Sequence, residues 1–414
     1  MNKRRVVITG MGAVTPVGLT MEETWQAIQD GVCGIAPITQ YDTTGRKVTL
    51  AAEVKGFDAD ALFGRMEAKR MDRCNQFALA AAREALEDAR WSMNPKEAER
   101  CGVSLSSGIG GFATVEEAKE RGMEKGYDRV SPFMIPNIIS NMSAGRIAID
   151  AGFKGMCTCP VTACAGGGNA VGDAFHYIRD GYAEAMLCGG TEACVTPLAI
   201  GGFTSMKALH QGGDPARASI PFDKARSGFV MGEGAAVVLL EELEHAKARG
   251  AKIIAEVIGY GATCDAHHIT APAPGGEGGA KAMIMALADA GAQPEEIGYI
   301  NAHGTSTQLN DAGETAAVKT AFGGHAYKLM MSSTKSMTGH MLGAAGAVEA
   351  AITAMALKDG FIPATIGYKE KDDVCDLDVV PNTGRNAQIR YAMSNSLGFG
   401  GHNVSLVLKK WEGM

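Results

Sequence analysis

One cysteine in the middle of the chain lies in a context that suits nucleophilic chemistry. Cys164 stands among small residues in the segment 161–170 (VTACAGGGNA), after Pro160 and before an apolar run compatible with a helix. This pattern predicts a sharp strand-to-helix turn with Cys164 at or near the first helical position. The first turn of a helix carries unpaired N–H groups and the positive end of the macrodipole, which favour a thiolate and can bind an oxyanion. The alternative is a buried structural cysteine, since most free cysteines are inert.

Two histidines and a lysine in the second half of the chain favour the chemical interpretation. His303 follows a buried strand in the segment NAHGTST, and Lys335 and His340 lie in KSMTGHMLGAAG, where a strand passes through a polar turn into a small-residue helix. Ligands of α/β proteins bind at such strand ends. A single histidine is more often a hydrogen-bonded structural residue. Three such groups on strand-to-helix connections of one half point to a shared site.

A glycine-rich segment near the end of the chain is a further candidate. Residues 398–401 read GFGG. Glycines of this kind allow backbone N–H groups to approach a ligand closely. An ordinary hairpin turn is the alternative explanation.

Two other uses of cysteine and histidine fit the sequence less well. Cys157 and Cys159 have no second pair at zinc spacing, and the two histidines are not spaced as ligands on one helix face. A papain-type hydrolase needs only one histidine and an orienting Asn or Asp. It would leave the second histidine and the lysine unexplained.

Buried strands and helices alternate along the chain, and the pattern begins twice. An apolar strand with a glycine turn and a threonine opens the chain, and residues 253–263 repeat that order. This predicts an α/β architecture with two similarly folded halves, covering residues 1–252 and 253–414. Residues 10–18 are expected to form a turn that is not a dinucleotide loop, because the third glycine position holds threonine. A long amphipathic helix is expected over 67–89, and an apolar loop over 131–137.

Composition excludes several classes of protein. The chain has 414 residues, of which 46% are hydrophobic and 21% charged, and its formal net charge of −7 argues against a nucleic-acid-binding protein. No run of 18 apolar residues is present, so no membrane span is predicted. The apolar start is too short for a signal peptide, and the ten cysteines form no disulfide framework. These features predict a cytoplasmic protein with free thiols.

These motifs together resemble the β-ketoacyl-acyl carrier protein synthases of bacterial fatty-acid synthesis, in particular the synthase II type. The resemblance covers essentially the whole chain and is very specific. It rests on the segments VVITGMG (6–12), TAC (162–164), NAHGTST (301–307), KSMTGH (335–340) and NSLGFGG (395–401). It implies a thiolase-like fold, in which two duplicated halves form a five-layer αβαβα arrangement, and a homodimer.

The resemblance also implies a decarboxylative Claisen condensation by ping-pong steps. Cys164 would take an acyl chain from acyl carrier protein as a thioester. His303 and His340 would then promote decarboxylation of malonyl-carrier protein and stabilise the enolate. The backbone N–H groups of Cys164 and Phe399 would hold the tetrahedral oxyanion, and Lys335 would orient the histidines.

Substrate-binding roles follow from the same resemblance. Thr305 and Thr307 would hold the pantetheine arm of the substrate. Phe399, with Gly400 beside it, would gate an acyl pocket that Ile109 helps to line. Phe133 would reach the pocket of the partner subunit. No protein-bound cofactor is expected, because the substrates carry phosphopantetheine on acyl carrier protein.

Two further groups of residues are matched to the family. Carrier-protein docking is expected at four basic residues, because acyl carrier protein is strongly acidic; they are Lys69, Arg70, Arg129 and Lys207. A structural monovalent cation, often found in the family, would lie near Asn301, Glu349, Ser394 and Asn395. The chain has Leu397 and His402 where the family more often has Phe and Thr, which puts the chain-length preference in question.

Three alternatives share parts of this pattern. A polyketide ketosynthase would have every one of these active-site residues and differs in its product. A degradative thiolase would act on CoA with a second catalytic cysteine, whereas the matching position here is His340. A catalytically inactive partner subunit would lack the nucleophile, which Cys164 supplies here.

Overall fold

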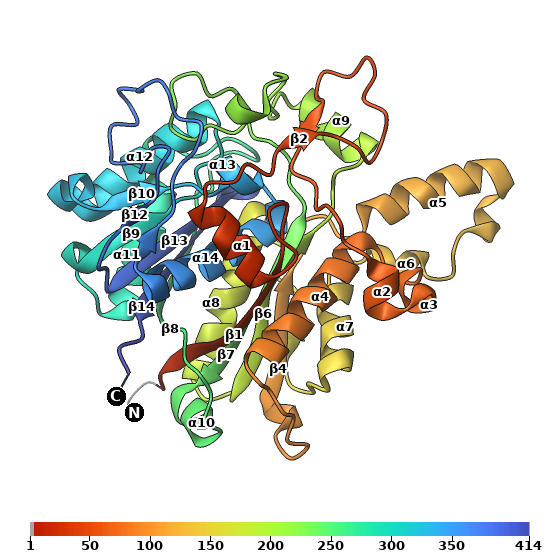
Figure 1. The fold of residues 1–414 in the computed structure, drawn as a ribbon, viewed down its shortest axis with the longest axis horizontal. Coiled ribbons are helices and arrows are strands. Elements are labelled where there is room, and N and C mark those ends of the chain that lie inside the picture. The colour runs from red at the N-terminus through yellow and green to blue at the C-terminus, as the bar shows by residue number, and fades with distance from the viewer. Residues whose placement is uncertain (1–3, 414) are drawn as a thin grey trace.

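The computed structural model describes residues 4–413, and ten strands of this region form one mixed sheet (Figure 1). These strands are β1 (Val6–Val14), β4 (Cys101–Ser106), β5 (Cys157–Thr158), β6 (Ala185–Glu192), β7 (Gly234–Glu242), β8 (Ala255–Cys264), β9 (Ile297–Asn301), β10 (Met330–Ser332), β13 (Tyr391–Gly398) and β14 (His402–Lys410). Their order across the sheet is β10-β9-β13-β14-β8-β1-β7-β6-β4-β5. Two short pairs form separate ribbons, β2 (Ala36–Pro37) with β3 (Leu50–Ala51) and β11 (Phe361–Ile362) with β12 (Arg385–Asn386).

Helices precede, follow and separate these strands. The α-helices are α1 (Met21–Gln29), α2 (Ala59–Phe63), α3 (Arg65–Ala68), α4 (Arg73–Asp88), α5 (Phe112–Lys125), α6 (Met134–Ile138), α7 (Met142–Ala151), α8 (Gly166–Arg179), α9 (Pro197–Ser205), α10 (Leu243–Ala248), α11 (Glu277–Ala290), α12 (Gln308–Phe322), α13 (Lys335–Thr338) and α14 (Ala345–Asp359). None of the helices described between residues 4 and 413 combines the length and the apolar character that crossing a bilayer requires.

The pairing pattern of the sheet shows the duplication. From the centre outwards, β1 and β7 are antiparallel, β7 and β6 are antiparallel, and β6, β4 and β5 are parallel. The series β8, β14, β13, β9, β10 has the same pattern in the same order. The two series meet where residues 6–8 of β1 pair with 255–257 of β8. The α/β fold with two duplicated halves is therefore confirmed, while the boundary at 252 and 253 stays a prediction.

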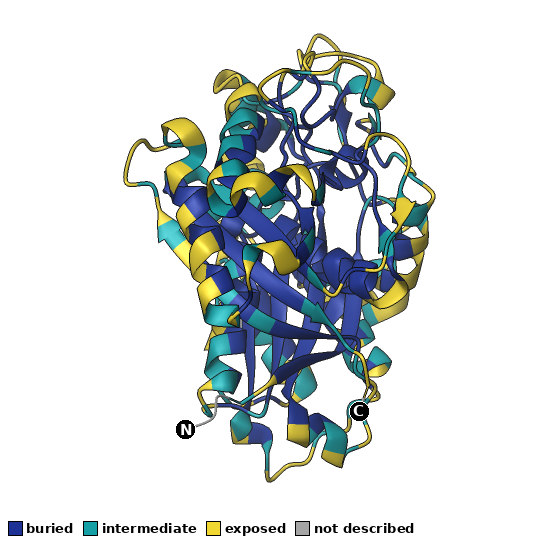
Figure 2. Cartoon of the chain, turned by 90° about the vertical axis from the view of Figure 1, so that its left-hand side faces the viewer, coloured by how far each residue is buried: buried dark blue, intermediate teal, exposed yellow. Residues whose placement is uncertain are grey.

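The helices complete five layers. Helices α8 and α14 contact strands of both series and lie between them (Figure 1). Helices α4 and α7 cover the outer face of the first series, and α11 covers that of the second and packs against α12. Helix α14 is buried along almost its whole length, and exposed residues gather on the outer helices and loops (Figure 2).

Two glycines of β1 allow the outer helix α4 to approach the sheet closely. A Cβ on Gly10 would lie 2.1 Å from the carbonyl oxygen of Ala85, and one on Gly12 would lie 2.1 Å from that of Ala81. The strand continues through these glycines to Val14. The turn predicted over 10–18 is therefore wrong for residues 10–14, where the glycines serve helix packing and not chain reversal. It is confirmed at Thr15–Gly18, whose backbone N–H and carbonyl groups pair with each other.

The matching glycines of β8 have the same function. A Cβ on Gly259 would lie 2.3 Å from the carbonyl oxygen of Ala286 in α11, and one on Gly261 would lie 2.1 Å from that of Ala282. The same contact between a strand and its outer helix therefore occurs once in each half.

Two other local expectations also differ from the structure. The helix expected over 67–89 is divided, because α3 ends at Ala68 and α4 starts at Arg73 behind Asp72, whose carboxylate accepts the N–H of Cys74 and caps the helix. The segment 131–137 was expected to be a loop, but α6 starts within it at Met134.

We predict that Gly12→Ala lowers the free energy of unfolding by about 1–3 kcal/mol, the usual cost of overpacking a dense interior. A matched control is Gly313→Ala in α12, where a Cβ meets nothing within 4 Å. There the higher helix propensity of alanine is expected to raise stability by up to about 1 kcal/mol. Urea denaturation of the two variants measures the difference, and equal effects would contradict the packing argument.

Candidate active site

Cys164 is presented on a strained turn between β5 and α8. A short 3-10 turn over Ala163–Ala165 precedes α8, and Ala163 has φ of +49°. A left-handed backbone at a residue other than glycine costs about 1–3 kcal/mol and persists where surrounding contacts enforce it. Cys164 itself is only 8% exposed. The predicted strand-to-helix turn is present, and its strain is a feature that residue types did not indicate.

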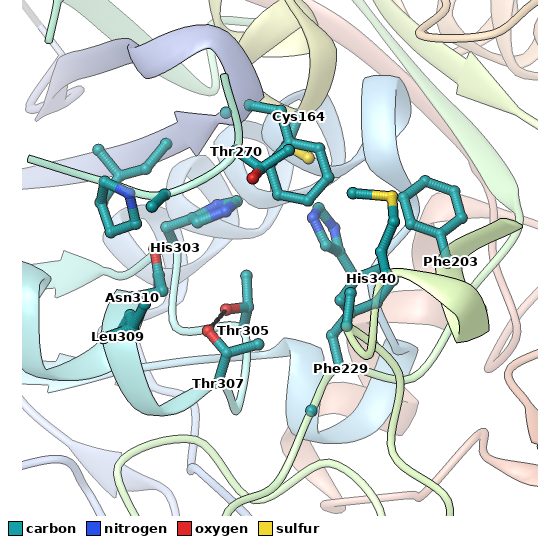
Figure 3. Close-up of a pocket in the computed structure, with 18 of the residues that line it drawn as sticks. Cys164, Phe203, Phe229, Thr270, His303, Thr305, Thr307, Leu309, Asn310 and His340 are labelled. Atoms are coloured by element: carbon teal, nitrogen blue, oxygen red, sulfur yellow. Dashed lines mark hydrogen bonds between the residues drawn. The ribbon is translucent and has the colours of Figure 1, made fainter. Parts of the chain in front are cut away.

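A cavity of about 380 Å³ contains the predicted chemical groups from both halves (Figure 3). Its lining includes Cys164, Lys207, His303, Thr305, Thr307, His340 and Phe399 among the residues singled out from the sequence. The imidazole rings of His303 and His340 point towards Cys164, with ring centres 5.2 Å apart (Figure 3). Phe203 and Phe229 form an apolar wall beside His340 that sequence reasoning missed.

Two backbone N–H groups approach the sulfur of Cys164, those of Cys164 itself and Phe399. The turn between β13 and β14 provides the second of them, since Gly400 has φ of +82° and Gly401 of +76°. Gly398 lies close to the nucleophile turn, because a Cβ there would lie 2.9 Å from the carbonyl oxygen of Thr162 and 3.2 Å from the backbone nitrogen of Cys164. Two fixed backbone donors at one reacting group are what the predicted oxyanion hole requires.

Burial dominates the ionisation of the sulfur. It raises the pKa of the Cys164 thiol to about 12, although the charge of Lys335 and the N–H of Phe399 act in the opposite direction. The resting group is therefore a thiol and not the thiolate that its position at a helix start favours. The proton of this thiol has to leave during acyl transfer.

A buried ion pair fixes the state of the two histidines. The ammonium of Lys335 contacts a carboxylate oxygen of Glu349 and lies 3.4 Å from Nδ1 of His303. An ammonium is only a donor, so Nδ1 of His303 accepts and its Nε2 carries the proton. Burial and the charge of Lys335 lower the pKa of His303 and of His340 well below the usual value. Both rings are therefore neutral at pH 7.

A buried carboxylate and a hydroxyl behind the cavity hold the segment that carries His303. Glu314 of α12 accepts the backbone N–H groups of His303 and Gly304, both at 2.8 Å. Ser333 donates its hydroxyl to the carbonyl of Gly304 at 2.6 Å. Asp311 and Glu314 lie three residues apart in the sequence, one turn of α12 from each other. This pair of acidic residues shortly after the histidine segment is the sequence signal that could have indicated Glu314.

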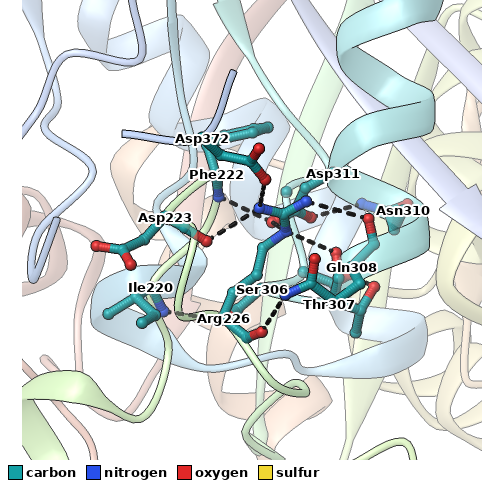
Figure 4. Close-up of polar contacts among 12 residues, drawn as sticks. Ile220, Phe222, Asp223, Arg226, Ser306, Thr307, Gln308, Asn310, Asp311 and Asp372 are labelled. Atoms are coloured by element: carbon teal, nitrogen blue, oxygen red, sulfur yellow. Dashed lines mark hydrogen bonds and ion pairs between the residues drawn. The ribbon is translucent and has the colours of Figure 1, made fainter. Parts of the chain in front are cut away.

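Arg226 is a second residue that the sequence did not indicate (Figure 4). Its guanidinium is buried, contacts the carboxylate of Asp372 at 2.5 Å and donates to the carbonyl of Thr307 at 3.1 Å. Close by, Ser306 adopts φ of +66° and accepts the N–H of Ile220. These contacts connect the segment that follows His303 to the loop before β7. They also hold the strained backbone of Ser306 in place.

Glu192 holds backbone segments near Cys164 in the way that Glu314 holds the His303 segment. Its buried carboxylate accepts the N–H groups of Gly108 at 2.8 Å, Ile109 at 3.2 Å and Gly343 at 3.0 Å. It thereby joins turns from both halves. Ile109 shares an apolar cluster with Cys164.

The remaining predicted residues lie outside the cavity lining. Phe133 packs under the guanidinium of Arg70, 5.4 Å from it, and not against the pocket of its own chain. Lys69, Arg70 and Arg129 are exposed. The backbone N–H of Gly400 donates to the carbonyl of Ile269 at 2.7 Å. The four residues matched to a cation are buried on β9, β13 and α14.

We predict that the burial of His303 and His340 as neutral rings removes stability as the pH falls below about 6.5, because unfolded histidines take up protons there. The buried carboxyls of Glu314 and Glu349, whose pKa burial raises to about 7, act in the opposite direction over this range, so the histidine contribution is isolated by a variant that lacks the two rings. Buried His303 and His340 remain neutral, so the unfolded state binds more protons than the folded state. Each histidine contributes a slope of about 1.4 kcal/mol per pH unit between its ordinary pKa and its lowered one.

The double variant His303→Asn, His340→Asn is the control for this prediction. Its unfolding free energy, measured by denaturant titration between pH 7 and pH 5, is expected to fall less steeply than that of the unchanged protein. Identical slopes would show that the two rings are not held neutral.

Comparisons with known proteins match the chain over its full length. Residues 3–246 match the family model "Beta-ketoacyl synthase, N-terminal domain", and residues 254–369 match "Beta-ketoacyl synthase, C-terminal domain". The chain is 51% identical to 3-oxoacyl-[acyl-carrier-protein] synthase 2 of Synechocystis sp. over 413 residues, covering 100% of this chain and 99% of the relative. It is also 51% identical to the enzyme of that name from Staphylococcus aureus over 409 residues, covering 99% of each chain.

Solved structures agree with these matches. A type II PKS ketosynthase in complex with its acyl-carrier protein superposes with a TM-score of 0.92 at 34% identity, covering 99% of this chain and all of the other. A beta-ketoacyl synthase from Burkholderia phymatum STM815 gives a TM-score of 0.91 at 35% identity, with the same coverage. The cysteine, the paired histidines and the duplicated sheet thus stand in a fold shared over its whole length, and the chain belongs to the β-ketoacyl synthase family.

Proposed function

We propose that this chain is a 3-oxoacyl-acyl carrier protein synthase, which condenses a cysteine-bound acyl chain with malonyl-acyl carrier protein. The observation that carries the proposal is the meeting of the Cys164 sulfur, two backbone donors and two neutral imidazoles at one cavity. The full-length relatives of that name support the proposal.

The first step is acyl transfer to Cys164. The sulfur adds to the carbonyl carbon of the acyl-carrier thioester, and the N–H groups of Cys164 and Phe399 receive the developing oxyanion. The tetrahedral adduct then expels the thiol of the carrier arm, which leaves with the proton that the cysteine has lost. The products are an acyl-cysteine thioester and the free carrier thiol.

The second step is condensation. The bond between the malonyl carboxylate and its methylene carbon breaks, carbon dioxide leaves, and the electron pair forms an enolate whose oxygen accepts hydrogen bonds from His303 and His340. The methylene carbon attacks the acyl-cysteine carbonyl, and the carbon–sulfur bond to Cys164 breaks. A proton from solvent restores the thiol, and the 3-oxoacyl group remains on the carrier arm.

The mouth of the cavity suits a pantetheine arm. The hydroxyls of Thr305 and Thr307 lie 3.0 Å apart at the wall, where one can donate to an amide of the arm while the other accepts (Figure 3). Phe399 lies near Phe203, with ring centres 6.4 Å apart, and both line the cavity together with Cys164. This position supports a gate at Phe399 and Gly400, with Ile109 at the acyl pocket beyond it.

Acyl carrier protein is the partner that this proposal requires. Lys207 is exposed and lines the cavity, so it combines a positive charge with access to the arm. Lys69 and Arg70 are exposed in the turn between α3 and α4, and Arg129 is exposed in the short 3-10 turn after α5. Arg70 is partly neutralised by Glu67 at 2.7 Å, which leaves Lys69 as the stronger candidate of the two.

A second copy of the chain fits the free edge of the sheet. Strand β5 ends the sheet, and both of its residues are exposed. An open edge with unpaired backbone groups favours pairing with another strand. Val161 and Tyr182 nearby are 53% and 62% exposed. These features support a homodimer joined at β5, in which Phe133 serves the pocket of the partner.

The residues matched to a monovalent cation fit one in part. Both amide atoms of Asn301 and Oε2 of Glu349 are buried without a hydrogen-bond partner among the described residues, and Ser394 pairs with Asn301 across β9 and β13. The side-chain oxygen of Asn395 already accepts the hydroxyl of Ser405 at 2.8 Å. A cation held at Asn301 and Glu349, with Ser394 and Asn395 beside it, would supply positive charge to a buried carboxylate.

The thiols support a cytoplasmic setting. All ten cysteines, which lie within residues 4–413, are free, and a reducing cytoplasm keeps them so.

A ketosynthase of a polyketide pathway remains the alternative function, since ketosynthases of that kind share the fold at 34–37% identity. The 51% identity to the fatty-acid enzymes favours the first assignment.

The two half-reactions test the proposal separately. His303→Ala is expected to lower decarboxylation of malonyl-carrier protein by about 10²-fold or more, because it removes an enolate donor. Acyl transfer to Cys164, followed as an increase in intact protein mass, should continue in this variant. Cys164→Ala should show no mass increase, and His325→Ala, outside the cavity, should behave like the unchanged protein. An adduct on another residue, or equal loss of both half-reactions in His303→Ala, would overturn the assigned roles.

Carrier docking has its own test. Reversal of Lys69 and Arg70 to Glu is expected to raise the KM for carrier-bound substrate by about tenfold and to leave kcat unchanged, because rim charges act on association. The increase should shrink with added salt. Lys96→Glu, a charge reversal in an exposed loop, is the control. An unchanged KM in the double variant would refute docking at this patch.

A further inference from the structure

A chain of three side-chain hydrogen bonds begins two residues before the nucleophile. The hydroxyl of Thr162 donates to Oδ1 of Asn169 at 2.5 Å, and Nδ2 of Asn169 donates to the phenol oxygen of Tyr260 at 2.6 Å. The phenol in turn donates to the carboxylate of Asp173 at 3.1 Å. All donors point the same way and the chain ends on a carboxylate, so each bond polarises the next one.

The chain joins the two halves of the fold. Thr162, Asn169 and Asp173 belong to the turn and helix of the nucleophile, whereas Tyr260 is on β8 of the second series. Neither Tyr260 nor Thr162 nor Asn169 is among the residues lining the cavity in the part of the chain that the structure describes. These side chains therefore do not reach the substrate.

A glycine of helix α8 makes room for the ring of Tyr260. A Cβ on Gly172 would lie 2.3 Å from the phenol ring, so only glycine lets the ring lie against this turn of the helix. His176 contacts the same ring edge-on, with centres 5.1 Å apart. The ring is thus held on both sides, and its hydroxyl reaches Asn169 and Asp173.

The turn that presents Cys164 needs such support. Ala163 has φ of +49°, and the carbonyl of Thr162 accepts only the N–H of Ala165 at 3.1 Å within the turn. The bond from Thr162 to Asn169 spans the turn from its start to the first turns of α8. It restrains the strained peptide from outside, which is the condition under which such strain persists.

We infer that Tyr260 is a positioning residue for Cys164 and acts through Asn169 and Thr162. The hydrogen-bond chain holds the strained turn so that the sulfur faces the two oxyanion N–H groups. The inference rests on the proposed acyl transfer to Cys164. It assigns to β8 of the second half a part in the acylation step, besides the N–H of Phe399 that receives the oxyanion.

The test compares two substitutions at position 162 that separate the hydroxyl from the methyl group. Thr162→Val removes the hydroxyl and keeps the shape, whereas Thr162→Ser keeps the hydroxyl. Single-turnover acylation by acyl-carrier protein, followed by intact mass, should fall about tenfold in Thr162→Val and stay within about twofold of the unchanged protein in Thr162→Ser. Decarboxylation of malonyl-carrier protein should change by less than about twofold in both, since the histidines are not held by this chain.

Tyr260→Phe provides an independent variant that keeps the ring on Gly172. It should slow acylation several-fold, and the double variant with Thr162→Val should be no slower than Thr162→Val alone, because both break one chain. Tyr327→Phe, a phenol outside this network, is the control. Wild-type acylation rates in both single variants, or equal losses in acylation and decarboxylation, would overturn the inference. Absence of an acyl adduct in the unchanged protein would instead refute the proposed function.

Discussion

The buried contact between Lys335 and Glu349 is the one charge interaction that reaches all three reacting side chains of the cavity. An ammonium so deep in the protein is tolerable only beside a carboxylate, and removal of one partner from such a pair costs about 3–5 kcal/mol. Burial lowers the pKa of His303 and His340, the same ammonium lowers it further, and the ammonium also assigns the proton of His303 to Nε2. It also offsets part of the burial effect on Cys164. One charge therefore acts on all three reacting side chains.

The duplicated scaffold explains how groups so distant in sequence meet. Helices α8 and α14 lie between the two series of strands, so the turn before α8 and the turns around α13 and α14 open on one space. Glycines on β1 and β8 keep each outer helix against its own strand, which leaves the two inner helices to pack against each other. Close packing of this kind fixes relative positions because dense interiors deform little. The nucleophile of one half is thereby held opposite the histidines of the other.

The features that were predictable from sequence are those encoded locally. The small residues around Cys164, the polar strand ends at His303 and His340, and the glycines around Phe399 each carry their signal within a few positions. Arg226 and Glu192 were missed because their partners are remote, as in the contact of Arg226 with Asp372, 146 positions along the chain. The glycines of β1 misled for the same reason. Within a few positions of sequence these glycines indicate a turn. In the structure they are strand residues, because helix α4, more than 60 positions further along the chain, packs directly on them.

The hydrogen-bonding state of His303 also separates this site from a hydrolytic one. A hydrolase needs an imidazole with a free lone pair to take a proton from the nucleophile or from water. In His303 that lone pair, on Nδ1, already faces the ammonium of Lys335, and Nε2 carries a proton. The ring can therefore donate to an oxyanion but has no free site at which to accept a proton. Hydrolysis of the acyl-cysteine thioester would need a base to activate water, and His303 is not such a base because its only lone pair faces an ammonium. The ring is instead a donor to the enolate oxygen of the carbon nucleophile formed in the same cavity.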